Sequence, residues 1–157
     1  MSRFLITICR RLWVLCCLFI CFSGCTDDYH NPIPQRHVYI EVDLTFRDKE
    51  LLPSTAHKIF KPGNIIVGKE FTGYGGVLVT NSIFGGYKAF DLACPHEVRT
   101  DAAVAIDDEY NAVCKVCGSK YEVILGYGSG ACIAGPSKHA LRQYTISGSG
   151  KALIVRN

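Results

Sequence analysis

The sequence lacks the apolar periodicity that helices need. No segment of its 157 residues repeats apolar side chains every three or four positions over several turns, and the chain has no heptads and no internal repeat. These absences exclude a helical bundle, a coiled coil and a repeat protein. The chain has instead short apolar stretches between glycine-rich turns, which is typical of an all-β sandwich or barrel.

The chain also lacks a marked excess of charge and the motifs of common enzymes. Its 17 Lys and Arg exceed its 14 Asp and Glu only through Arg3, Arg10 and Arg11, so nothing after them indicates a nucleic-acid surface. The glycine-rich segment 71–76 lacks the spacing and the following helix of a phosphate-binding loop. No Ser, His and Asp have the order of a catalytic triad, and no two carboxylates have catalytic spacing. We expect an electron carrier or a binding module rather than a stand-alone enzyme.

The first 24 residues have the composition of an export signal. Three arginines, at positions 3, 10 and 11, come before the apolar run 12–22, and Ser23 and Gly24 follow it. A basic segment, an apolar segment and small residues at a cleavage point are typical of a signal peptide. The apolar run is too short to span a bilayer comfortably. We therefore expect residues 1–24 to be removed; a membrane anchor and a secretory signal without a lipid are the alternatives.

Cys25 directly follows the two small residues, and this arrangement resembles the lipidation box of bacterial lipoproteins. In that class the cysteine carries the lipid and becomes the first residue of the mature protein. The resemblance implies a membrane-anchored lipoprotein of the cell envelope, in the outer membrane and either periplasmic or surface-exposed. Residues 25–36, with Pro32 and Pro34, are expected to form a flexible tether, and residues 37–157 a single domain.

Alternation of apolar and polar residues predicts the strands of this domain. It is clearest over 38–44, where Val38, Ile40, Val42 and Leu44 alternate with polar or amphipathic residues. Further strands are expected at 65–67, 77–80, 87–91, 104–106, 112–113, 121–125, 141–146 and 152–155. Hairpins should join 77–80 to 87–91 and 141–146 to 152–155. Between 47 and 61, where prolines interrupt the pattern, we expect a loop with one helical turn.

Soft metal ligands gather in two short clips of the chain. Cys94 and His96 form a C-x-H clip, and Cys114 and Cys117 form a C-x2-C clip seventeen residues later. Short clips of this kind, separated by a longer loop, are how small domains hold a metal ion or an iron–sulfur cluster. Each clip directly follows an expected strand and should lie on a loop that leaves a sheet. Cys132, the other cysteine after Cys25, is expected to be a small buried apolar residue.

The clips and their surroundings resemble the Rieske [2Fe-2S] domain family. That family has C-x-H, a loop of similar length, and C-x2-H-G-S; the second clip here reads Cys114-Lys115-Val116-Cys117-Gly118-Ser119. The resemblance extends in motif detail over 87–146 and in strand order over 38–155. It implies an antiparallel β-sandwich or barrel with a small cluster-binding subdomain, whose cluster-binding loops are 92–100 and 113–137.

The resemblance also implies a set of ligands. Cys94 and Cys114 would hold one iron, and His96 and Cys117 the other, with Cys117 standing where the family has its second histidine. The additional thiolate makes the cluster more negative, so we expect a reduction potential below the Rieske range. His96 alone would then couple the electron to a proton.

Further positions of the resemblance surround these ligands. Gly118 would let the backbone approach the cluster. Ser119 stands where the family's serine donates to a bridging sulfide, and Tyr121 where a tyrosine hydroxyl donates to the sulfur of the first cysteine. Gly135 and Pro136 resemble the loop that covers the cluster. Donors to sulfur stabilise the reduced cluster and raise its potential.

The expected function is one-electron transfer through a [2Fe-2S] cluster to a redox protein partner. Three alternatives stay open for the clips: a structural zinc ion held by three Cys and one His, disulfides in an oxidising compartment, and a domain that keeps the fold without a cluster. Export by the general secretory route favours the last, because a chain that crosses a membrane unfolded cannot carry a preassembled cluster.

Overall fold

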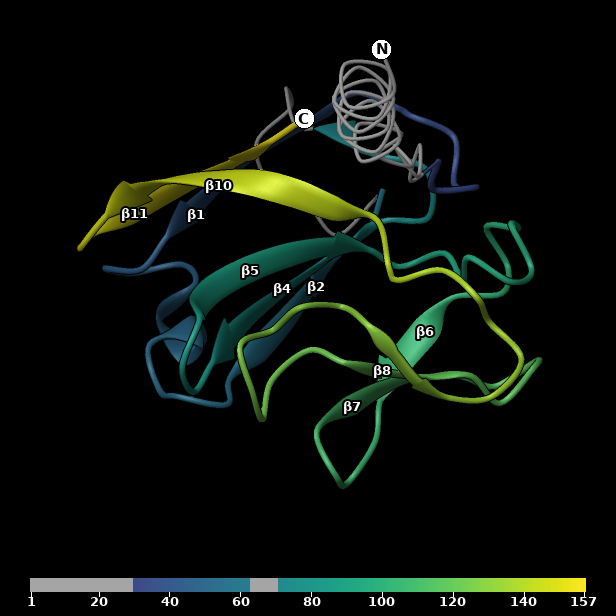
Figure 1. The fold of residues 1–157 in the computed structure, drawn as a ribbon. Helices are drawn as coiled ribbons and strands as arrows, with labels where there is room; N and C mark the ends of the chain where they lie inside the picture. The colour runs from purple at the N-terminus through teal and green to yellow at the C-terminus, as the bar shows by residue number, and fades with distance from the viewer. Residues whose placement is uncertain (1–29, 63–70) are drawn as a thin grey trace, which may run out of the picture. The chain divides into compact units, whose positions relative to one another are not determined.

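The structure is a computed structural model, and it describes residues 30–62 and 71–157 (Figure 1). The predicted signal peptide, Cys25 and the expected strand at 65–67 lie outside these residues. Among the described residues, no helix has the length and apolar character to cross a membrane.

The described chain is nearly all β and antiparallel, which confirms the predicted fold class. One sheet is a nearly closed barrel with the strand order β2-β4-β5-β10-β11-β1-β3. A second, smaller sheet has the order β6-β7-β8-β9. The strands of the first sheet are β1 (Val38–Asp43), β2 (His57–Phe60), β3 (Phe71–Thr72), β4 (Val77–Ser82), β5 (Gly86–Asp91), β10 (Gln143–Ser149) and β11 (Ala152–Arg156). Those of the second are β6 (Val104–Ile106), β7 (Asn111–Cys114), β8 (Lys120–Glu122) and β9 (Cys132–Ala134).

Both predicted hairpins are present, and the strand at 38–44 has the predicted buried face. Val38, Ile40 and Val42 of β1 are buried while the residues between them are not. Strand β4 pairs with β5, and β10 pairs with β11. The alternation in the sequence therefore located β1, the strand that buries one complete face.

The loop prediction for 47–61 was wrong in part. The expected helical turn is the 3-10 helix η1 (Lys49–Leu51), but β2 follows it and pairs with β4. Strand β2 lies at the edge of the sheet and buries only Phe60. Its sequence therefore lacks the alternation of apolar and polar residues that would predict a strand. Strand β9 was missed for the same reason, because it also lies at a sheet edge and buries none of its residues.

The strand expected over 121–125 ends at Glu122. The Glu122 carboxylate accepts hydrogen bonds from the backbone N–H groups of Gly126, Gly128 and Ser129, and this turns the chain away from the sheet. Val123 and Ile124 are buried in the turn rather than in a strand. Their apolar character thus correctly predicts that they are buried, but the prediction that they lie in a strand is wrong.

Strand β4 joins two hydrophobic cores. Its Val77 and Val79 side chains pack into the core inside the barrel sheet. Leu78, on the opposite face, packs into a second core with residues of the small sheet such as Val104 and Ala112. Successive side chains of a strand point to opposite faces, so a strand buried throughout can belong to both cores. This second core also contains Cys94 and Cys114.

Residues just before the predicted start of the domain at residue 37 contact the domain. Ile33 is buried, and its carbonyl accepts a hydrogen bond from the Arg142 guanidinium over 3.0 Å. The Asn31 side chain donates to the carbonyl of Ala140 over 2.9 Å. The compact unit runs from Asn31 to Asn157, so the end of the expected tether is packed against the domain.

Candidate metal centre

The first clip begins three residues after β5 and is held by backbone hydrogen bonds. Cys94 N–H donates to the carbonyl of Ala102 over 3.1 Å, and Val98 N–H donates back to the carbonyl of Cys94 over 2.9 Å. The Tyr74 hydroxyl donates to the Val98 carbonyl over 3.0 Å. The clip is thus a closed turn, fixed at both of its ends.

A buried carboxylate anchors the chain just before this turn. Asp91, the last residue of β5, accepts hydrogen bonds from the N–H groups of Tyr74, Gly75 and Ala93 and from the Tyr144 hydroxyl. A buried charge is stable only when its oxygens are satisfied in this way. Asp91 therefore ties the turn after β3, the strand β10 and the approach to Cys94 to one point.

The second clip is a tight turn at the end of β7. Cys114 closes that strand, and its carbonyl accepts from Gly118 N–H over 2.9 Å while its N–H donates to the carbonyl of Ser119 over 2.9 Å. Gly118 has φ = +74°, a left-handed conformation that favours glycine. This conformation turns the chain so that β8 can pair with β7.

The structure brings three of the four predicted ligands together. The sulfur atoms of Cys94, Cys114 and Cys117 all lie within 4.8 Å of one another. Cys94 and Cys117 are in contact, with their sulfurs 3.6 Å apart. Cys94 and Cys114 are buried and Cys117 is half-buried. Three close thiols can hold a soft metal ion.

Two hydroxyl groups contact the sulfurs. The Tyr121 hydroxyl lies 3.3 Å from Cys94 Sγ. The Cys117 thiol donates to Ser119 Oγ over 3.2 Å, and the same oxygen accepts from the N–H of Ser137 over 3.1 Å. Both hydroxyls are themselves buried, so the thiols have polar partners in an otherwise apolar core.

A glycine lets the covering loop approach Ser119. Gly135 has φ = +96°, and a Cβ atom there would lie 2.5 Å from the Cα of Ser119. Real Cβ atoms do not approach that closely, so another residue would push the loop away from Ser119 and weaken the hydrogen bond that Ser137 N–H donates to Ser119 Oγ. Pro136, which follows, is exposed.

Burial and hydrogen bonds act in opposite directions on two of the thiols. Burial raises the pKa of Cys114 to about 11, despite backbone donors from Cys117 and Val116. Burial also opposes ionisation of Cys117, but hydrogen bonds from the hydroxyl and N–H of Ser119, together with those from Cys94 and Cys114, outweigh it and lower the pKa of Cys117 below its usual 9.0. Burial and the neighbouring Cys94 raise the pKa of Tyr121, whose hydroxyl therefore keeps its proton.

The remaining candidates lie outside the sulfur cluster. His96 is exposed, and its ring is not among the ligand atoms that converge with the three sulfurs. Cys132 is half-buried rather than fully buried, and its thiol donates to the carbonyl of Ala134 over 3.3 Å. The reduced thiols form no disulfide with one another in this arrangement.

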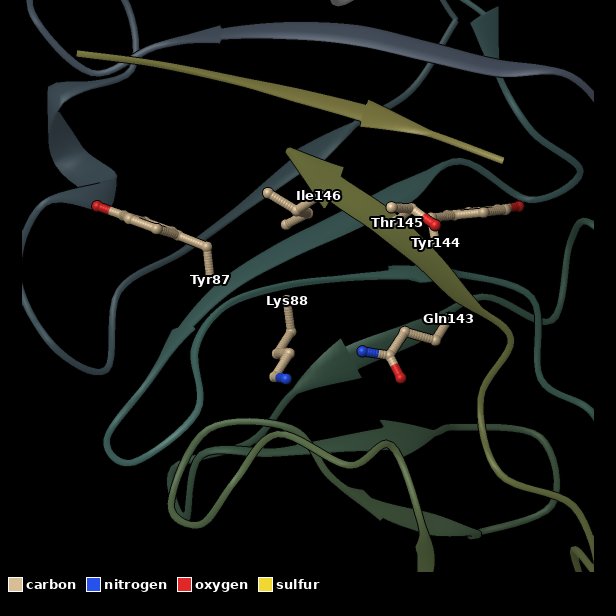
Figure 2. Close-up of a pocket in the computed structure, with 6 residues that line it drawn as sticks. All are labelled: Tyr87, Lys88, Gln143, Tyr144, Thr145 and Ile146. Carbon is tan, nitrogen blue, oxygen red and sulfur yellow. The ribbon is translucent and has the colours of Figure 1, made fainter. Parts of the chain in front are cut away.

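A shallow pocket of about 360 Å³ lies elsewhere, between β5 and β10. These strands pair only at Phe90 with Gln143 and at Ala89 with Tyr144, and the pocket opens where they diverge. Its lining residues are Tyr87, Lys88, Gln143, Tyr144, Thr145 and Ile146. Figure 2 shows Lys88 and Gln143 on one side of the strands and Tyr87 and Ile146 on the other. The lining has one cation and no acid or thiol, so no set of catalytic groups converges there.

Sequence reasoning did not identify Asp91 and Tyr74, which hold the first clip. The sequence offers one indication of the role of Asp91: an acid at the end of an apolar strand, followed by Leu92 and Ala93, needs several hydrogen-bond donors if it is buried. Tyr74 had no signal, since its contact with Val98 depends on the path of two loops. No protein-family model and no curated protein matches the chain.

Proposed function

We propose that this domain is an electron carrier that holds a Rieske-type [2Fe-2S] cluster through Cys94, Cys114 and Cys117, with His96 as the fourth ligand. The observation that carries the proposal is the cluster of three thiols with the Tyr121 and Ser119 hydroxyls against two of the sulfurs. Thiolates with hydroxyl donors are the surroundings that hold iron–sulfur clusters and set their potentials.

The burial of the four residues supports the proposed pairing of ligands. Cys94 and Cys114, the proposed inner pair, are both fully buried. Cys117 is half-buried and His96 exposed, so the proposed outer pair lies toward solvent. Electrons reach a redox partner most easily from the iron nearest the surface, and His96 is placed to exchange a proton with solvent.

When bound, the cluster would accept and return one electron. The chain's own residues do the rest. With Cys94 bound as a thiolate, the Tyr121 hydroxyl 3.3 Å away would donate to its sulfur, and Ser119 would stabilise negative charge at Cys117. The buried Asp91 carboxylate fixes the chain before Cys94, and Gly135 lets the covering loop approach Ser119 closely. The three thiolates add more negative charge than the two-His set, so the potential should be low.

A second candidate is a single zinc ion bound by the three thiolates. It is favoured by the 3.6 Å between the sulfurs of Cys94 and Cys117. Tetrahedral bonds of about 2.3 Å place two thiolates roughly 3.8 Å apart on one ion. In the proposed cluster these two sulfurs belong to different irons and must lie further apart than they do here.

Metal and sulfide analysis of anaerobically purified protein separates the two candidates. The proposal predicts iron and acid-labile sulfide in equal amounts, two of each per chain, and their loss in Cys114→Ser. Cys132→Ser is the matched control, since this thiol lies outside the cluster, and it should keep both. One zinc per chain without sulfide, before and after reconstitution with iron and sulfide, would establish the second candidate instead.

A further inference from the structure

We propose that the metal-free domain forms a disulfide between Cys94 and Cys117, which closes the site against metal. The two sulfurs are 3.6 Å apart and in contact, so they need to approach by only about 1.5 Å to reach the length of an S–S bond. The residues stand 23 positions apart in the chain, on the two separate clips. A disulfide between them would covalently link the two loops.

The access of the two thiols differs, and the difference assigns their roles. Cys117 is half-buried, so a small-molecule oxidant can reach its sulfur. Cys94 is fully buried beneath it, in contact with both the Cys117 sulfur and the Tyr121 hydroxyl. Cys117 is therefore the thiol that reacts first with an external reagent, and Cys94 is the thiol that resolves the product.

The reaction is ordinary thiol–disulfide exchange with a small-molecule disulfide such as oxidised glutathione. Cys117, as thiolate, attacks one sulfur of the oxidant, breaks its S–S bond and releases one glutathione thiol. Cys94 then attacks Cys117 Sγ, breaks the mixed disulfide and releases the second glutathione. Two protein thiols are oxidised, one external disulfide is reduced to two thiols, and the two protons leave with the released glutathione.

Disulfide formation does not depend on the proposed cluster, but its consequence does. With Cys94 and Cys117 bonded, only Cys114 of the three thiols can bind metal. The oxidation state of one thiol pair then decides whether the site can be loaded. Reduction of that pair would be required before iron and sulfide enter, which makes the domain sensitive to the redox poise of its compartment.

Thiol mapping of the metal-free, reduced chain tests the pairing. The protein is incubated with oxidised glutathione, the remaining thiols are alkylated, and the peptides are identified by mass spectrometry. Cys94 and Cys117 should become protected together and appear in one cross-linked peptide pair, while Cys114 stays alkylated. The same treatment in urea should remove this selectivity, because the fold sets the contact. A disulfide between Cys114 and Cys117, or glutathione that remains on Cys117 of the folded wild-type chain, would overturn the proposal.

Two variants separate the roles of the thiols. Cys94→Ser should trap glutathione on Cys117, and Cys117→Ser should leave Cys94 reduced and protected by burial. Loading is then tested by adding iron and sulfide to the oxidised and the reduced wild-type protein. If only the reduced form loads, the disulfide controls loading as proposed. Equal loading of both forms contradicts this control. If neither form loads, both the proposed cluster and the proposed control of loading are contradicted. The Cys94–Cys117 disulfide itself is still decided by the thiol mapping.

Discussion

Each thiol of the cluster takes its properties from its immediate neighbours. Cys114 lies in an apolar core, whereas Cys117 has the Ser119 hydroxyl and N–H beside it. A thiolate in the first position is poorly solvated, and one in the second is stabilised by two donors. Two cysteines separated by only two residues therefore differ in acidity.

Alkylation of the reduced, metal-free protein at different pH values measures this difference. The pKa of Cys117 is lowered, so its alkylation rate should reach half of its maximum below pH 9.0. The pKa of Cys114 is raised to about 11, so its rate should keep rising toward that pH. Ser119→Ala should move the Cys117 midpoint upward by removing a donor to the thiolate. A Cys117 midpoint at or above 9.0 would show that burial outweighs the hydrogen bonds.

The Tyr121 hydroxyl should raise the reduction potential of the loaded protein. Tyr121→Phe removes the donor 3.3 Å from Cys94 Sγ and leaves the ring in the core. One hydrogen bond to sulfur contributes about 1 kcal/mol, or roughly 40 mV for a one-electron couple. Potentiometric titration should therefore give a potential lower by about that amount. Tyr110→Phe, at an exposed tyrosine, is the control and should leave the potential unchanged.

Val98 adopts a backbone conformation that β-branched residues avoid. Its φ is +53°, at the end of the turn that contains Cys94 and His96. Left-handed geometry costs an L-residue roughly 1–2 kcal/mol, and glycine would relieve this cost in the folded state. Glycine also increases the conformational entropy of the unfolded chain, which offsets about 0.4–1 kcal/mol of the stabilisation. Val98→Gly should therefore stabilise the protein by about 0.5 kcal/mol in urea unfolding. Val116→Gly, whose φ is not positive, should destabilise it; a loss of stability in both variants would argue against strain at Val98.

At the scale of elements, the end of β5 holds the site to the barrel sheet. The Asp91 carboxylate receives donors from the turn after β3, from β10 and from the residue before Cys94. The second core continues from β4 and β5 into the small sheet. The positions of the clips thus depend on strands that carry no ligand themselves.

Replacement of Asp91 tests this dependence. Asp91→Asn keeps the shape of the side chain but removes the charge and one acceptor, which should cost about 2–3 kcal/mol. Urea unfolding measures the loss. The metal affinity of the folded variant should fall with it, because one of the two pairs of donors that fix the site, Gly75 with Ala93 or Tyr74 with Tyr144, loses its acceptor. Asp108→Asn, at an exposed acid, should change stability by less than about 0.5 kcal/mol. An Asp91→Asn protein of unchanged stability would remove Asp91 from this role.

The sequence predicted the elements whose own residues carry the pattern. Val38, Ile40 and Val42 mark a strand because alternate residues are buried on one face. Strand β2 and strand β9 could not be seen, because an edge strand is stabilised by a neighbour's backbone rather than by its own side chains. The spacing of Cys94, Cys114 and Cys117 likewise predicted a common site. The contact of Cys94 with Cys117 could not be predicted, because it depends on how two loops pack.

At the scale of the whole described unit, the thiols lie where the barrel sheet meets the smaller sheet, with Cys94 after β5 of the first and Cys114 at the end of β7 of the second. The two cores meet at β4, whose alternate residues belong to each. The thiol cluster lies in the second core, with Cys94 and Cys114 buried and Cys117 toward solvent. This arrangement places the thiol cluster near the surface of the described unit, which the proposed one-electron exchange with a protein partner would require.

The most direct measurement of the central proposal is electron paramagnetic resonance of the anaerobically purified protein. The proposed cluster should give no signal in the oxidised protein and one unpaired electron per chain after chemical reduction, because a reduced [2Fe-2S] cluster has a single unpaired spin. The signal should return to zero on reoxidation, be absent from Cys114→Ser and be kept by Cys132→Ser. A protein that contains iron and sulfide but gives no such signal, or a colourless protein that gives none after reconstitution, would contradict it.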